Sequence, residues 1–192
     1  MDDKLNNLPD YFFAYGSQMW APSFHFIDSS VATLRGYSRS FCVNSTIYRG
    51  TCQNPGLVLG LVPGGSCQGI LYQLATKEKE CEWEKIFAKE MPGRHQINGS
   101  QAYLPQIVKV TNDLTQEEHM AIVLVVDMQS SKYSGELNQA EIVRRLVKCQ
   151  GQAGSNLEYF ENTLQHLTKL NLKDEGLLQI ESQIRQIVIN NV

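Results

Sequence analysis

Glycines punctuate the strand-like segments of this chain, and this feature limits its fold more than any other. Residues of high β-propensity gather in several short segments of the first two-thirds, and glycines stand inside or directly after many of them. Glycine inside a strand marks a bulge or a sharp bend, so these strands favour a small, strongly curved sheet. The last third carries apolar residues at helical spacing instead. We predict an α+β fold, a small curved mixed sheet or β-barrel with flanking helices, in a single domain over residues 1–192.

The expected elements follow from local patterns. Pro63-Gly64-Gly65-Ser66 offers the backbone angles of a tight turn, which predicts a hairpin between two strands on either side. A helix is predicted from Thr76, as its cap, to Pro92, as its terminator. The expected strands are 11–15, 31–48 with a bend at Gly36, 57–62, 68–74, 103–110 and 119–127; the later helices lie around 137–146, from Ser155 or Asn156 onward, and at about 175–189.

Charge and cysteine usage narrow the function classes. The net charge of -3 comes from 17 basic and 20 acidic residues that are interspersed, with no basic run to neutralise a phosphate backbone, so we expect no nucleic-acid partner. Five cysteines form no C-x-x-C pair, and the four histidines show no ligand spacing, which favours a reduced cytoplasmic protein without a metal or organic cofactor. Residues 1–7 are polar and the apolar run 121–126 is too short for a bilayer, so we expect no membrane association.

The segment Tyr15-Gly16-Ser17-Gln18 is the first candidate binding site. An apolar strand runs directly into a glycine and a small hydroxyl residue there. The missing Cβ of Gly16 lets a ligand approach the main chain, so the amides of Gly16, Ser17 and Gln18 can point at a carboxylate or at a developing oxyanion. The sequence leaves these two roles open, and it leaves open a plain tight turn after a core strand.

Glu90 is the candidate catalytic residue. At about 100° per residue the apolar side chains of the 76–92 helix share one face (Trp83, Ile86, Phe87 and Met91), and Glu90 falls within it. Glu82, Glu84, Lys85 and Lys89 fall on the flanks or the solvent side. Burial raises the pKa of a carboxyl group, and a general base near neutral pH needs such a pKa. The alternative is that the last turn frays before Pro92 and Glu90 turns to water.

In their order and spacing, the motifs resemble the ChaC-type γ-glutamylcyclotransferases from Tyr11 to about Leu178. The matching segments are Tyr15-Gly16-Ser17, Gly36 to Phe41, Ser45 with Arg49-Gly50-Thr51, Pro55 to Leu61, Gly64 to Gly69, Lys89-Glu90-Met91, Tyr103-Leu104-Pro105, Tyr133-Ser134-Gly135 and Gly154 to Tyr159. Three features depart from the family pattern: Gln18 stands where leucine or asparagine is usual, Lys89 where arginine is common, and the segment 92–102 is longer and more polar.

The resemblance implies a small β-barrel with flanking helices and a lyase that releases 5-oxoproline from a γ-glutamyl compound. In this branch the substrate is typically glutathione, which leaves cysteinylglycine, so the enzyme degrades glutathione. The Y-G-S loop would hold the γ-glutamyl unit, Glu90 would be the catalytic base, and Tyr133 would lie near the substrate. The α-amine of the substrate supplies the nucleophile, and Glu90 would transfer its proton to the departing amine.

Some assignments stay open on the sequence alone. Arg39 or Arg49 is a candidate partner for a substrate carboxylate, although either is more often a solvated surface residue. Cys52 and Cys67 are interpreted as small core residues and not as nucleophiles. The longer 92–102 segment keeps other γ-glutamyl amino acids or γ-glutamylamines open as substrates. A further alternative is a non-catalytic barrel in which Glu90 pairs with the ammonium group of a small ligand.

Overall fold

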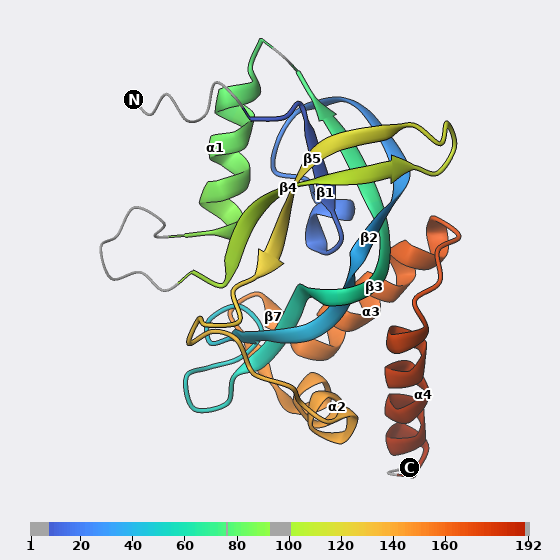
Figure 1. Cartoon of the computed structure of the whole chain (residues 1–192). Helices are drawn as coiled ribbons and strands as arrows, with labels where there is room; N and C mark the ends of the chain where they lie inside the picture. The colour runs from blue at the N-terminus through green and yellow to red at the C-terminus, as the bar shows by residue number, and fades with distance from the viewer. Residues whose placement is uncertain (1–7, 76, 93–100, 191–192) are drawn as a thin grey trace. The chain divides into compact units, whose positions relative to one another are not determined.

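The computed structural model describes residues 8–75, 77–92 and 101–190, and Figure 1 shows their strands and helices along the chain. The strands are β1 (Tyr11–Ala14), β2 (Phe26–Ser45), β3 (Gly56–Leu74), β4 (Tyr103–Asn112), β5 (Glu118–Val126), β6 (Gln150–Gly151) and β7 (Gly154–Ser155). The helices are the 3-10 turn η1 (Ser17–Met19), α1 (Lys79–Glu90), α2 (Gln139–Lys148), α3 (Asn156–Lys169) and α4 (Glu175–Asn190). The predicted α+β class is confirmed.

The long strands close into a barrel with the order β1-β3-β2-β4-β5. β1 closes it by pairing antiparallel with β3, where Phe12 faces Tyr72, and parallel with β5, where Tyr11 faces Ala121. β4 and β5 form a hairpin. Asn112 stabilises its turn, because the side-chain oxygen of Asn112 accepts hydrogen bonds from the main-chain amides of Leu114 and Thr115. The predicted mixed barrel is confirmed, and it has five strands in the described part of the chain.

The predicted hairpin at residues 57–74 is wrong, because Gly56–Leu74 is one continuous strand. Gly64 and Gly65 adopt the positive φ angles of 103° and 71° that a turn would use. Here they bend the strand without reversing it. The reason is pairing over long range: β3 lies between β1 and β2, and its end from Ile70 to Gln73 is bonded to β1. A local hairpin would have used one of the two edges of this segment, so β3 could not have paired with both β1 and β2.

The chain divides into two compact units, Met1–Arg39 with Leu61–Ser130, and Ser40–Gly60 with Ser131–Val192. In the first, Phe12 meets the edge of Trp83, and Trp83 stacks on Phe87 at 5.6 Å between ring centroids. In the second, α2 contacts α3 and α4, and Phe41 packs against Phe160. The single domain over residues 1–192 stays a prediction.

Helices α2 and α3 each begin with a side-chain cap. Ser155 is the cap of α3, because its hydroxyl accepts the amide of Glu158 at 3.0 Å, and this settles the choice between Ser155 and Asn156. Asn138 caps α2 in the same way through the amide of Glu141.

Helix α1 begins at Lys79, and its N-cap residue is Glu78, whose side chain makes no capping hydrogen bond to the described part of the chain. The predicted cap at Thr76 is therefore wrong, and Thr76 itself lies outside the described residues.

The cysteines divide between core and surface. Cys67 is buried, as predicted, and has 3% of its surface exposed. The core prediction is wrong for Cys52, which is exposed. Its neighbours in the loop before β3 are exposed as well, so no apolar cluster forms around it. Sequence context does not distinguish these two cysteines, since both stand beside turn-forming residues.

Membrane insertion through a helix is not indicated. Within residues 8–75, 77–92 and 101–190, every helix is too short or too polar to serve as a membrane span.

Replacing Asn156 by alanine should destabilise the protein by about 3 kcal/mol, because a buried amide and a buried carbonyl lose their partners. The Asn156 side chain is fully buried, accepts the amide of Leu57 at 2.6 Å and donates to its carbonyl at 2.7 Å. Urea unfolding monitored by circular dichroism measures the change. The matched control is Asn54→Ala, at an exposed loop position, which should alter stability by less than about 0.5 kcal/mol. Equal losses of stability in the two variants would contradict a stabilising role for the hydrogen bonds between Asn156 and Leu57.

Candidate active site

Helix α1 presents Glu90 from its last turn. Its predicted apolar face is confirmed, since Trp83 and Ile86 are fully buried and Phe87 is 4% exposed. The last turn does not fray, because the amide of Met91 donates to the carbonyl of Phe87 at 2.8 Å. Glu90 is half-buried at the end of this closed turn. The packing of the apolar face therefore fixes the position of the Glu90 backbone, from which the carboxylate extends.

The turn that follows β1 meets this carboxylate. The side-chain amide of Gln18 donates to Oε1 of Glu90 at 2.6 Å, between residues 72 positions apart in the sequence. Gln18 itself is buried, with 4% of its surface exposed, and its Oε1 accepts the main-chain amide of Ser23 at 3.0 Å. The structure thus brings together the two sequence features that were predicted to act together, Tyr15 to Gln18 and Glu90.

The environment of Glu90 suits a proton carrier. Burial raises the pKa of Glu90; the hydrogen bond from Gln18 and the ammonium of Lys89 lower it, and the net pKa lies above the ordinary 4.5. Lys89 is held beside the turn, because its Nζ donates to the carbonyl of Ala21 at 2.9 Å. A carboxyl group with a raised pKa can accept a proton and return it near neutral pH.

Gly16 and Ser17 form the entry to η1. The carbonyl of Gly16 accepts the amide of Met19 at 2.9 Å, and the carbonyl of Ser17 accepts the amides of Trp20 and Ala21. The first amides of a helical turn have no partner inside that turn, so those of Ser17 and Gln18 are oriented outward along its axis. Both Gly16 and Ser17 are half-buried. This geometry suits the binding of an anionic group, and that role stays a prediction.

Two tyrosines hold this turn from the barrel. The Tyr15 hydroxyl donates to the carbonyl of Leu124 at 2.7 Å. The Tyr72 hydroxyl donates to the carbonyl of Gln18 at 3.0 Å and approaches that of Met19 at 3.3 Å, and burial raises the pKa of Tyr72 to about 12. Tyr72 was not among the predicted site residues. Its position on β3 opposite Phe12 becomes visible only once the strands are paired.

Arg39 also supports the turn. Its Nε donates to the carbonyl of Tyr15 at 2.7 Å, and its Nη2 donates to the carbonyl of Gln68 at 2.7 Å. Arg39 therefore joins the end of β1 to β3. Its predicted contact with a substrate carboxylate stays a prediction. The other candidate, Arg49, contacts Glu158 at 3.2 Å and lies over the ring of Tyr159.

Tyr133 belongs to the second unit. It bridges to Val43 in an antiparallel contact, and the amide of Ser134 next to it donates to the carbonyl of Cys42 at 2.9 Å. Burial raises the pKa of Tyr133, with smaller contributions from Cys42 and Glu136. Its role near the substrate stays a prediction. Of the segment 92–102, residues 93–100 lie outside the described residues, so the proposed effect of that segment on substrate choice stays a prediction too.

A family model described as ChaC-like protein matches residues 11–187 of this chain. The chain belongs to the ChaC-like family. The resemblance inferred from the motifs is therefore confirmed.

Two relatives show how much of the chain the family shares. An Escherichia coli (strain K12) protein named glutathione-specific gamma-glutamylcyclotransferase is 31% identical over 183 residues, which cover 95% of this chain and 76% of that protein. A human protein named glutathione-specific gamma-glutamylcyclotransferase 1 is 29% identical over 151 residues, covering 78% of this chain and 65% of that protein.

A solved structure shares the fold. The crystal structure of a γ-glutamyl cyclotransferase specific to glutathione from yeast superposes with a TM-score of 0.80 and covers 94% of this chain and 97% of its own. At 18% identity, this likeness supports the fold alone. This ChaC-like chain thus shares its fold with that structure.

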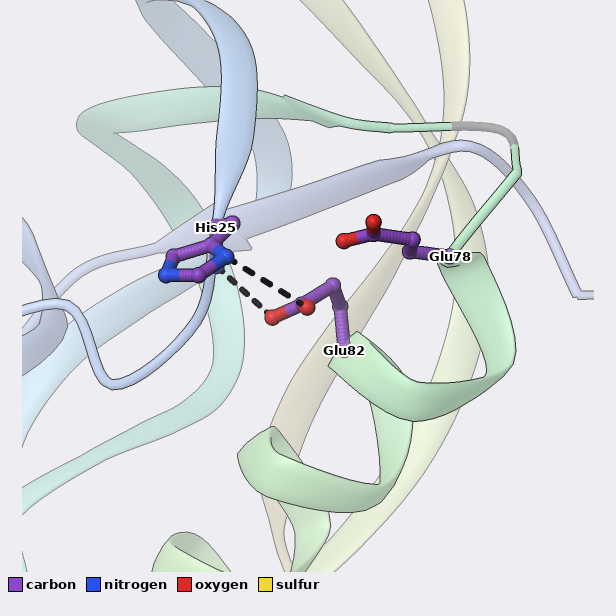
Figure 2. Close-up of side chains that lie close together, drawn as sticks. All are labelled: His25, Glu78 and Glu82. Carbon is purple, nitrogen blue, oxygen red and sulfur yellow. Dashed lines mark hydrogen bonds and ion pairs between the residues drawn. The ribbon is translucent and has the colours of Figure 1, made fainter.

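A second acidic cluster of this ChaC-like chain lies at the other end of α1, where Figure 2 shows His25, Glu78 and Glu82 side by side. Glu82 was predicted on the flanks or solvent side of the helix, and its complete burial shows that prediction to be wrong. The segment before β2 covers this flank, because the main-chain amide of His25 donates to Oε2 of Glu82 at 2.7 Å. Sequence patterns within α1 contain no signal for that contact.

These three residues carry donor atoms within 4.8 Å of one another, the spacing of a metal site. The electrostatics disfavour a cation there, because Lys85 already donates to Oε1 of Glu82 at 2.7 Å. Burial raises the pKa of Glu82, but the Lys85 ammonium and the His25 amide outweigh it and the net pKa is lowered. We interpret Glu82 as the ionised anchor that joins α1 to the segment between η1 and β2.

Replacing Glu82 by glutamine should lower the free energy of unfolding at pH 7 by about 1–3 kcal/mol, because a charge-assisted hydrogen bond to Lys85 is lost. The folded-state pKa lies below 4.5, so this stabilisation is present above pH 4.5 and disappears as the pH falls through the folded-state value. Urea unfolding of both proteins at pH 7 and below pH 4 measures the difference. The control Glu80→Gln changes an exposed side chain on the same helix. A stability gap between Glu82→Gln and wild type that does not narrow in acid would contradict the anchor.

Proposed function

We propose that this protein is a γ-glutamylcyclotransferase that converts glutathione into 5-oxoproline and cysteinylglycine. The observation that carries the proposal is the half-buried Glu90 carboxylate, placed 2.6 Å from Gln18 in the turn that begins with Gly16 and Ser17. The names of the Escherichia coli and human relatives support glutathione as the substrate.

The reaction needs one group that moves a proton. The α-amine of the γ-glutamyl unit attacks the γ-carbonyl carbon, a new C–N bond closes the lactam, and the C–N bond to the cysteine nitrogen breaks. At neutral pH an α-amine with a pKa of about 8 begins mostly as ammonium. The α-nitrogen loses two protons as its ammonium becomes the lactam N–H, and the cysteinyl nitrogen gains two as its amide N–H becomes the ammonium of cysteinylglycine. Glu90 accepts a proton before the attack and returns it to the departing cysteinyl nitrogen, and the second proton passes from the new lactam nitrogen to the released amine. All atoms of glutathione appear in the two products, so the scheme uses only the substrate and the Glu90 carboxylate.

The turn after β1 provides the complementary contacts. The amides of Ser17 and Gln18 open η1, and we assign to them either the α-carboxylate of the γ-glutamyl unit or the oxyanion that develops on the γ-carbonyl. The turn is held in place, because the Tyr15 hydroxyl donates to the carbonyl of Leu124 on β5 and Arg39 donates to the carbonyl of Tyr15. Such fixed donors do not have to reorganise during the reaction, which is how preorganised sites lower a barrier.

We further propose that the protein acts in the cytoplasm on a small-molecule substrate, without nucleic-acid or membrane partners. None of the five cysteines, all of which lie within the described residues, forms a disulfide, which suits a reducing compartment. The net charge of -3 is distributed along the chain without a basic run.

Replacing Glu90 by glutamine should lower kcat by about 10²- to 10⁴-fold while substrate binding is retained, because only the proton carrier is lost. The rate of 5-oxoproline release from glutathione measures turnover, and the thermal shift with glutathione measures binding. The matched control is Glu80→Gln, an exposed position on the same helix, which should retain wild-type turnover. Turnover by Glu90→Gln within about threefold of wild type would end the assignment of Glu90 as the base.

Glutathione should react with a kcat/KM at least about tenfold higher than γ-glutamyl-alanine, because the alanine compound lacks the thiol and the glycine carboxylate that a specific site would contact. Product analysis with both compounds checks this, since 5-oxoproline and cysteinylglycine should form in equal amounts from glutathione. Equal kcat/KM values would favour a broader γ-glutamyl substrate class. Heat stabilisation by glutathione with full recovery of unchanged ligand would favour a non-catalytic binding barrel instead.

A further inference from the structure

The orientation of the Gln18 side chain is determined by its neighbours. Its Oε1 lies 3.0 Å from the main-chain nitrogen of Ser23, and a main-chain amide can only donate. The oxygen of the Gln18 amide must therefore face Ser23, and its NH₂ group must face Glu90. Gln18 is nearly completely buried, so water does not compete strongly for either contact.

This orientation makes the two oxygens of Glu90 unequal. Oε1 accepts a hydrogen bond from Gln18 at 2.6 Å. Among the residues that the structure describes, none donates to Oε2. Within residues 8–75, 77–92 and 101–190, Oε1 is therefore the oxygen of Glu90 that is held, and the contact with Gln18 restricts the rotation of the carboxylate about the last side-chain bond.

We propose that Gln18 is a positioning residue that holds the Glu90 carboxylate through Oε1, so that Oε2 is the oxygen that exchanges a proton with the substrate. This inference rests on the proposed function, because it takes Glu90 as the base. The two parts of Gln18 then have different roles. Its main-chain amide, at the start of η1, is proposed to contact the substrate, while its side chain binds Glu90 and Ser23.

Gln18 also influences the charge state of Glu90 before the substrate binds. The NH₂ donor favours the ionised carboxylate, whereas burial opposes it. Among the described residues, Lys89 on α1 is the charged group that acts on Glu90, and it too favours the ionised form. Gln18, which contacts Glu90 from η1, is uncharged, and so is Ser23, which contacts Gln18. Tyr72, which donates to the main-chain carbonyl of Gln18, stays neutral because burial raises its pKa to about 12.

The test replaces Gln18 by methionine, which keeps the length of the side chain and removes both polar groups. The dependence of kcat/KM for glutathione on pH should move toward higher pH on its acidic side, because an unassisted buried carboxylate takes up a proton more readily. On the acidic limb, we expect the kcat/KM of Gln18→Met to be about tenfold lower than that of wild type. On the plateau at higher pH, the two values should agree within about threefold. The midpoint of thermal unfolding of each variant records any loss of folding.

The matched control is Tyr72→Phe. It removes the hydrogen bond to the main-chain carbonyl of Gln18 and leaves the Gln18 side chain in place. If Gln18 only supports the turn, both variants should lower activity by a pH-independent factor. If Gln18 positions Glu90, only Gln18→Met should move the acidic limb. Superimposable pH profiles of wild type and Gln18→Met would overturn the proposal.

A second measurement does not depend on turnover. In protein labelled with ¹³C at the glutamate carboxyl carbons, the Glu90 signal is assigned by its absence from Glu90→Gln and followed as the pH changes. Gln18→Met should titrate at higher pH than wild type. An inactive wild type whose Glu90 signal still responds to Gln18→Met would refute the proposed function and keep the positioning role. If the wild type is active and Glu90 titrates at the same pH in wild type and in Gln18→Met, the proposed function is kept and the positioning role is refuted.

Discussion

The candidate site depends on the pairing of β1 on both of its edges. Its four residues are bonded to β3 on one side, and Tyr11 and Phe12 pair with β5 on the other, so the strand closes the barrel and its end cannot move independently. The position of the turn at Gly16 is therefore fixed by the pairing of β1 with β3 and β5. Phe12 also contacts Trp83 of α1, which ties the helix to the same strand. A hydrogen bond of 2.6 Å between Gln18 and Glu90 is maintained because both of its partners start from fixed elements.

Two carboxylates on α1 show how environment separates roles. Glu82 is fully buried but accepts hydrogen bonds from an ammonium and a main-chain amide, and its pKa is lowered. Glu90, two turns later, accepts from the neutral amide of Gln18, and its pKa is raised. The first stays charged at neutral pH and anchors the helix. The second lies closer to the balance between its two forms, which is the property that proton transfer requires.

Local patterns predicted the helices well and misread one strand. The apolar face of α1 and the Ser155 cap could be found because they depend on contacts within a few residues. The segment Pro63 to Ser66 has the composition of a hairpin turn, yet Gly64 and Gly65 only bend β3. Turn chemistry states which backbone angles are accessible, whereas the partner strands decide whether the chain reverses. Glu82 was misplaced for a related reason, since the segment that covers it comes from elsewhere in the sequence.

By itself the sequence determined the class of the fold and the family, because these follow from local spacing and from motifs in a fixed order. It also predicted the two features of the candidate site, the turn at Tyr15 to Gln18 and the acid at Glu90. Only the tertiary structure decided which atoms meet. It showed that the side chain of Gln18 donates to Glu90, and it added Tyr72 as a support of the turn. Gln18 lies 72 positions from Glu90 and 54 positions from Tyr72 in the sequence, so both hydrogen bonds depend on barrel closure. Periodicity within one segment carries no information about such contacts.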